Sequence, residues 1–141
     1  MMHSAEKVIQ DLDEYFETVY AKAIDARDRF WEEARGSGKT LFRGVAISRR
    51  GNSVDIYWLR FAYKRHEHGP QEKPFKNRVP KGKGCYPRFS RVQMGRMEAW
   101  LEEMFNRYED EFEVYRQLMK ENRVMRRDLE RHLKLVKRIE G

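Results

Sequence analysis

The chain has 141 residues, of which 38% are charged and 13% aromatic, and its formal net charge is +7. The aromatic content is too high for a disordered chain, the length fits one domain spanning residues 1–141, and the single cysteine excludes an internal disulfide and a multi-cysteine zinc cluster. No apolar run approaches the roughly 18 residues of a membrane span, and the acidic first 30 residues are unlike a signal peptide, so we expect a cytoplasmic protein without membrane contact.

Residues 5–34 are predicted to form one amphipathic helix. Apolar side chains recur there at steps of three and four residues, which is the period of a helix face. These side chains are Val8, Leu12, Tyr15, Phe16, Val19, Tyr20, Ala23, Ile24, Phe30 and Trp31. The helix should end at Gly36-Ser37-Gly38, because glycine suits the position just past a helix end.

The next segment is predicted to form an antiparallel β-hairpin. Two runs rich in β-branched and aromatic residues, 40–49 and 53–65, flank Gly51-Asn52, and both of these residues tolerate the positive φ of a tight turn. Val54, Ile56 and Trp58 alternate onto one face, which we expect to be the core face.

The same face of the second run becomes basic at Arg60 and Lys64. A β-bulge or a change of the buried face near Leu59 would account for that switch.

Residues 66–88 hold all four prolines of the chain, which precludes a helix. Phe75 to Val79 lie between two of these prolines and are predicted to form a short edge strand, giving a three-stranded meander. His66 and His68 would share one face of a strand and could hold a metal, but further ligands are needed and a solvated loop is the favoured interpretation. Cys85 is interpreted as an incidental or packed thiol.

The chain is predicted to end in a long helix over residues 90–138, packed antiparallel on the first helix, so that the fold class is α+β. Met97, Leu101, Met104, Tyr108 and Phe112 begin an apolar stripe that continues to Ile139. The first helix is too short to cover this stripe. We therefore expect the stretch from Met119 to Ile139 to form a protruding arm that is buried in a homodimer or a partner.

Charge is also polarised along this helix. Residues 98–115 hold seven acidic side chains and one basic one, whereas residues 116–141 hold nine basic and four acidic side chains. Two antiparallel copies would pair these ends.

Motifs for catalysis and for nucleotide binding were sought and not found. The sequence has no Walker A loop, no GxGxxG, no CxxC and no HExxH. The carboxylates of the long helix, for example Glu102, Glu103, Glu109, Asp110 and Glu111, are interpreted as a solvated face. We therefore expect a protein that is not an enzyme and that uses no cofactor and no metal.

The positive charge is concentrated in the middle of the chain. Residues 1–35 carry a net charge of −4 and residues 98–141 a net charge of −1, whereas residues 36–97 carry +12. Such segregation points to an acidic partner, most often nucleic acid, although a solvated lysine-rich loop has the same composition. The predicted nucleic-acid-binding residues are Arg43, Arg49, Arg50, Arg60, Lys64, Arg65, Lys73, Lys76, Arg78, Lys81, Lys83, Arg88 and Arg91.

The physical reasons for this assignment are general ones. Lysine and arginine neutralise phosphates and release counterions, a two-stranded ribbon fits the major groove, and aromatic residues on a sheet can stack on unpaired bases. In Lys81-Gly82-Lys83-Gly84 the glycines permit close approach of the backbone to a phosphate while the lysines supply charge, although a flexible linker reads the same.

Two segments, Gly51 to Trp58 and Lys81 to Pro87, carry a resemblance. Together with the order of helix, hairpin, basic loop and long charged helix, they resemble the MobI family of conjugative transfer proteins over about residues 40–115. The resemblance implies a non-catalytic accessory factor that binds DNA at the origin of transfer of a conjugative or mobile element, or helps a relaxase to do so. The chain departs from the family pattern in the stretch from His66 to Pro70.

A second hypothesis assigns the function to the long helix. The protein would then be a coiled-coil adaptor or regulator, and its basic loop would bind RNA or an acidic partner. Steep salt dependence would distinguish DNA binding from an adaptor that depends on apolar residues such as Leu129 and Leu133.

Overall fold

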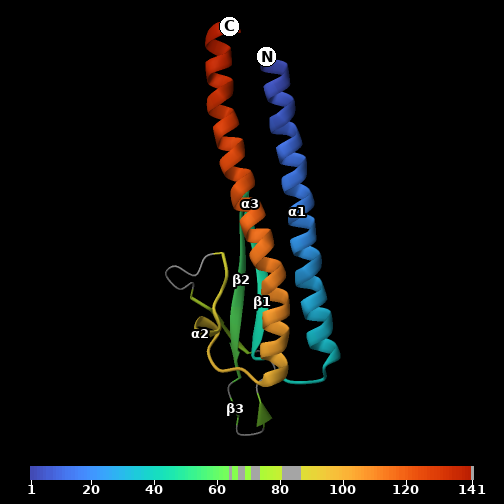
Figure 1. Cartoon of the computed structure of the whole chain (residues 1–141). Helices are drawn as coiled ribbons and strands as arrows, with labels where there is room; N and C mark the ends of the chain where they lie inside the picture. The colour runs from blue at the N-terminus through green and yellow to red at the C-terminus, as the bar shows by residue number, and fades with distance from the viewer. Residues whose placement is uncertain (64, 67–68, 71–73, 81–86, 141) are drawn as a thin grey trace.

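The computed structural model describes residues 1–63, 65–66, 69–70, 74–80 and 87–140. Two long helices, α1 (Met2–Gly36) and α3 (Ala99–Glu140), run antiparallel side by side, and a sheet packs against one end of this pair (Figure 1). The predicted α+β class and the packing of the long helix on the first helix are confirmed.

The sheet has three antiparallel strands in the order β1–β2–β5. They are β1 (Arg43–Arg50), β2 (Ser53–Ala62) and β5 (Phe75–Arg78), so the hairpin and its short third strand are confirmed. A second, two-stranded sheet pairs β3 (Arg65–His66) with β4 (Gly69–Pro70). In the hairpin turn only Gly51 has positive φ, at 60°, as the first central residue of a type II′ turn does.

The predicted bulge near Leu59 is absent. β1 and β2 pair without interruption from Arg43 opposite Arg60 to Arg50 opposite Ser53. The buried face nevertheless changes, because Phe61 is only 8% exposed although it lies on the face opposite Trp58. The cause is Trp31, which reaches from α1 around the edge strand β1 and packs its ring against Phe61.

Trp58 lies at the centre of the core, as predicted, and is fully buried. Its indole makes edge-to-face contacts with Phe30 of α1 and with Phe105 of α3, at ring-centroid distances of 5.2 and 5.1 Å. Such pairs contribute about 0.5–1.5 kcal/mol beyond the area they bury. One aromatic side chain therefore joins β2 to both helices.

The core also contains an ion pair. Glu109 and Arg116 of α3 are 0% and 5% exposed, and Arg116 Nη1 donates to Glu109 Oε2 at 2.6 Å. The other donors to Glu109 are Trp58 Nε1, at 2.9 Å, and the backbone N–H of Phe89, at 2.7 Å. The interpretation of Glu109 as part of a solvated face is therefore wrong.

Arg116 uses its remaining donors on backbone carbonyls. Nη2 donates to Ile56 O of β2 at 2.9 Å, and Nη1 donates to Pro87 O at 2.8 Å. Buried polar groups are costly unless they are hydrogen-bonded, and here both charged groups are satisfied. The pair thus fixes α3 against β2 and against the segment that precedes α2 (Arg91–Met94).

The predicted helix over residues 90–138 is interrupted. Ser90 caps the short helix α2, which ends at Met94 and is followed by Gly95, whose φ is 75°. The chain then turns and α3 begins at Ala99. Glycine permits this turn because positive φ costs it little.

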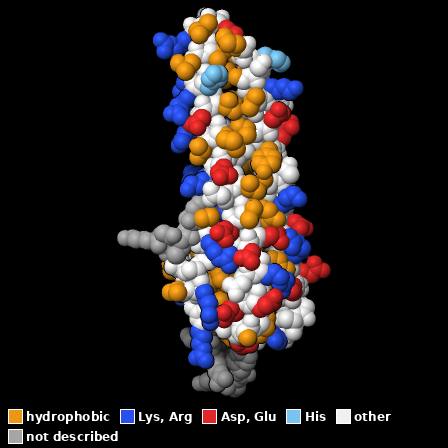
Figure 2. All heavy atoms as spheres, in the orientation of Figure 1, with side chains coloured by type: hydrophobic (Ala, Val, Ile, Leu, Met, Phe, Trp, Pro, Cys, Tyr) orange, Lys and Arg blue, Asp and Glu red, His pale blue; other side chains and the backbone are white. Residues whose placement is uncertain are grey.

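Past the hairpin, α1 and α3 continue alone as an arm, which we define as residues 2–15 and 120–140. Asn122 Nδ2 donates to Leu12 O at 2.9 Å, and the Met2 backbone N–H donates to Glu140 Oε2 at 3.2 Å. The expectation that α1 is too short to cover α3 is therefore wrong, since α1 follows it to the end. Apolar side chains still line one face of the arm (Figure 2).

The buried ion pair leads to a stability prediction. Arg116→Met should lower the free energy of unfolding by about 3–5 kcal/mol, because Glu109 is left charged and buried. Adding Glu109→Gln should restore part of this loss, since the charge is removed while the amide oxygen still accepts a hydrogen bond. Urea unfolding of both variants measures the difference, and a single variant within about 1 kcal/mol of the parent would contradict the assignment.

Candidate nucleic-acid interface

The face of the sheet that points away from α1 and α3 carries the candidate interface. The strand register places Ala46, Tyr57, Leu59, Lys76 and Arg78 on this face. Arg78 pairs with Asp55, and its guanidinium lies 3.7 Å from the centroid of the Tyr57 ring. An aromatic and basic surface of this kind suits a polyanion that also offers flat rings.

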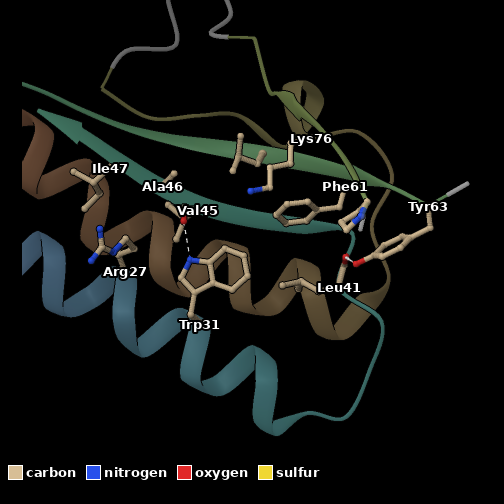
Figure 3. Close-up of a pocket in the computed structure, with 11 residues that line it drawn as sticks. Arg27, Trp31, Leu41, Val45, Ala46, Ile47, Phe61, Tyr63 and Lys76 are labelled. Atoms are coloured by element: carbon tan, nitrogen blue, oxygen red, sulfur yellow. Dashed lines mark hydrogen bonds between the residues drawn. The ribbon is translucent and has the colours of Figure 1, made fainter. Parts of the chain in front are cut away.

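A groove of about 590 Å³ opens beside this face at the edge of β1 (Figure 3). Trp31 forms one wall, and its Nε1 donates to Val45 O at 2.8 Å. A Cβ at position 44 would lie 2.6 Å from the Trp31 ring, so Gly44 is required there. Phe61, which packs against the indole, and Lys76 also line the groove.

The side chains that line the groove are of the kind that bind a ligand. Its lining is aromatic and aliphatic, with the cations Arg27 and Lys76 and the hydroxyl of Tyr63 as polar groups. Tyr63 Oη already donates to Leu41 O at 2.8 Å. Flat apolar walls beside a lysine would accept a planar ring that carries negative charge nearby.

Two of the predicted DNA-binding residues, Arg43 and Arg60, are used inside the fold. They lie opposite each other on β1 and β2 and donate to carbonyls around α2, Arg43 Nε to Met94 O at 2.9 Å and Arg60 to Gln93 O. Burial, and then the charge of Arg60, lower the pKa of Arg43. Arg60 Nε is buried without a hydrogen-bond partner among the described residues. Both arginines hold the α2 segment on the sheet.

Arg49 and Arg88 also bind within the chain. Arg49 donates to Glu17 at 2.8 Å and to Gly51 O at 2.7 Å, and its guanidinium lies 4.6 Å from the centroid of the Tyr20 ring. The hydrogen bond from Arg49 lowers the pKa of Glu17. Arg88 bridges two carboxylates of α3, Asp110 and Glu113, at 2.6 and 2.9 Å.

Four of the predicted residues point outward. Arg50, at the hairpin turn, and Lys76, on β5, are exposed and form no ion pair with a described residue. Arg78 is paired with Asp55 yet keeps 51% of its side chain exposed, and Arg91 pairs with Glu102 at 3.0 Å yet keeps 69% exposed. These four cations remain accessible to an external anion.

The other predicted residues lie outside what the structure describes. Lys64, Lys73, Lys81 and Lys83 are not among the described residues, and for Arg65 only the backbone in β3 is described. The side chains of His66, His68 and Cys85 also lie outside what the structure describes, so the metal hypothesis and the interpretation of Cys85 stay untested. In the described ranges, no three or more His, Cys, Asp or Glu side chains gather where a metal ion would fit.

Sequence reasoning missed a second basic surface. The sequence shows that residues 116–141 are rich in basic side chains, but their arrangement as a row of lysines and arginines along the last half of α3 was not predicted. These residues recur at steps of three and four, from Lys120 to Arg138, so a helical plot of the segment would have revealed them.

A comparison with protein families identifies the family of the chain. The model of a family described as MobI protein matches residues 19–130. The chain belongs to the MobI family. MobI proteins are accessory proteins of conjugative mobilisation, and MobI is not a known enzyme family.

Other comparisons add no relative. Neither a curated protein nor a solved structure is significantly similar to the chain. Among the helices in the described part of the chain, none combines the length and apolar character that crossing a membrane requires.

The adjacent residues Arg49 and Arg50 allow a matched test of two kinds of arginine, those that bind within the chain and those that point into solvent. Arg49→Gln should lower the free energy of unfolding by about 1–2 kcal/mol, because it loses an ion pair and a cation–π contact. Arg50→Gln should change it by less than about 0.5 kcal/mol. Thermal or urea unfolding measures both, and equal effects would refute the distinction between anchoring and outward arginines.

Proposed function

We propose that this MobI-family protein is a non-catalytic DNA-binding accessory factor. It acts at the origin of transfer of a conjugative or mobile element, where it binds the DNA itself or assists a relaxase. Family membership supports the setting of DNA transfer, and the charge distribution supports the contact with DNA.

One observation carries the DNA-binding part of the proposal. Residues 36–97 hold fifteen Lys and Arg but only three acidic residues. The one of these acids that lies among the described residues, Asp55, is already paired with Arg78. The positive charge of this region is therefore not neutralised from within it, and phosphates are the natural counter-charge.

The outward cations also have suitable neighbours. Lys76 borders the groove formed by Trp31 and Phe61, and Arg78 covers the ring of Tyr57. Phosphates near Lys76 would place sugars or bases at the groove. If these rings contact bases, the protein would prefer single-stranded DNA, because unpaired bases can stack on aromatic side chains whereas the bases of a duplex stack on one another.

Salt dependence tests the proposal. Arg50, Lys76, Lys81 and Lys83 are changed together to Gln, and Arg49 is retained because it anchors α1. Folding should be nearly unaffected, whereas the slope of log affinity against log salt should become shallower by up to about 3.6, or 0.9 per lost phosphate contact. Fluorescence anisotropy with DNA of the element that encodes the protein measures it; an unchanged affinity and slope would exclude this surface.

The arm supports a homodimer as a further part of the proposal. Seven apolar side chains along the two helices are at least 45% exposed, namely Met1 just before α1, Val8 and Tyr15 on α1, and Val114, Met125, Leu135 and Ile139 on α3. Helical geometry places them on the side of the helix pair away from the sheet, and Figure 2 shows hydrophobic side chains running along that side. In a symmetric antiparallel pair, the apolar side of one arm would pack on the apolar side of the other.

Sedimentation velocity tests the dimer. The parent protein should sediment as a dimer at tens of micromolar, and a variant carrying Met125→Glu and Ile139→Glu should sediment as a monomer, because two charges then lie within the interface. Val92→Glu is the matched control, since Val92 is 87% exposed but lies on α2. A monomeric parent would refute the homodimer.

A further inference from the structure

Six basic residues of α3 form a row that we call the α3 basic stripe. They are Lys120, Arg123, Arg127, Arg131, Lys134 and Arg138, and all are exposed. Steps of three and four residues place them on one face of the helix. From the first to the last, the stripe covers about 27 Å at 1.5 Å per residue.

The stripe continues the sheet-facing side of α3. Lys120 follows Arg116 by four residues and Arg123 follows it by seven, and Arg116 points at the sheet because it binds Ile56 O. Beneath the sheet this side of α3 is buried. Beyond the hairpin it emerges into solvent and becomes basic.

The hairpin tip lies at the same height along α3 as the first residues of the stripe. From Ile56 to Ser53, β2 rises about 10 Å, which equals the rise of about seven helical residues, from Arg116 to Arg123. Arg50 lies opposite Ser53 in the register and is exposed. The outward cation of the hairpin tip therefore lies level with the start of the stripe.

Local acids only partly neutralise this row. Asp128 accepts from Arg131 and lies 3.9 Å from Arg127, and Glu130 accepts from Arg126, which is outside the stripe. Three stripe members, Arg123, Lys134 and Arg138, form no ion pair with any residue that the structure describes. Figure 2 shows Lys and Arg side chains in a column along the edge of the arm that α3 forms.

We propose that the α3 basic stripe is a second contact surface for the phosphates of duplex DNA, continuous with the hairpin tip. The proposal rests on the proposed function and adds a surface to it. Duplex DNA carries one charge per about 1.7 Å of its axis when both strands are counted, so a length of 27 Å holds about 16 phosphates around the duplex, and those on one side can face the stripe. DNA is also straight over this length, since its persistence length is about 150 base pairs, and a straight helical arm matches a straight polyanion.

The test uses two variants with the same change in net charge. Arg123, Lys134 and Arg138 are changed to Gln in one, and Lys7, Lys22 and Arg35, which are exposed on α1, are changed to Gln in the other. Binding to a 30-base-pair duplex is measured by fluorescence anisotropy from 50 to 200 mM salt. Circular dichroism checks the helices, which Gln supports well.

The stripe variant should have a salt slope that is shallower by up to about 2.7, which reduces the loss of affinity over this salt range by up to roughly 40-fold. The α1 variant should follow the parent protein. If both variants follow the parent while the variant of Arg50, Lys76, Lys81 and Lys83 loses slope, the stripe is excluded and DNA binding stands.

Two other outcomes would refute the proposal. A parent protein that binds no duplex at 50 mM salt would refute the proposed DNA binding and, with it, the stripe. Unchanged DNA binding of the stripe variant, together with lost binding to polyglutamate, would assign the stripe to an acidic protein and overturn the proposal.

Discussion

The ion pair of Glu109 and Arg116 fixes how the parts of this molecule are arranged. Charged groups tolerate burial only when every donor and acceptor is satisfied, and this pair is satisfied by Trp58, Ile56 and backbone groups of residues 87–89. A shift of α3 by one turn, or of β2 by two residues, would strand a charge in the core. The pair therefore fixes the position of the hairpin along the axis of α3. That position brings the hairpin tip level with the first residues of the α3 basic stripe.

Basic residues serve two different purposes in this fold. Arg43, Arg60 and Arg116 point inward and donate to carbonyls that the irregular backbone around α2 and Pro87 leaves without strand partners. Arginine suits this task because its planar fork presents several donors at once. Arg50 and Lys76 face solvent instead. A net charge counted along the sequence adds both kinds together, so it overstates the charge that an external partner meets.

Local sequence patterns predicted most of the fold, because the helices, the hairpin and the third strand each have a recognisable residue pattern within their own segment. The long helix and the burial of Trp58 follow from the spacing of apolar residues, and the turn at Gly51 follows from the positive φ that glycine tolerates. The role of Glu109 was missed because it was read within a run of acids, although it lies four residues after Phe105 and three before Phe112, on the buried face. The reach of Trp31 around β1 had no local signal, since it depends on Gly44 being placed beside it by the tertiary structure. The α3 basic stripe was hidden by averaging charge over a segment instead of around the helix.

In the arm, three different surfaces lie on three different sides of α3. One side of α3 packs on α1, a second carries exposed apolar residues such as Met125 and Ile139, and a third carries the basic stripe. With 100° between successive residues, the apolar and basic sides lie more than 90° apart, so a partner on one does not cover the other. A symmetric dimer joined through the apolar sides would carry two stripes on its outer surfaces. Binding by the first stripe would then raise the local DNA concentration at the second, so affinity for DNA would depend on protein concentration through the dimer equilibrium.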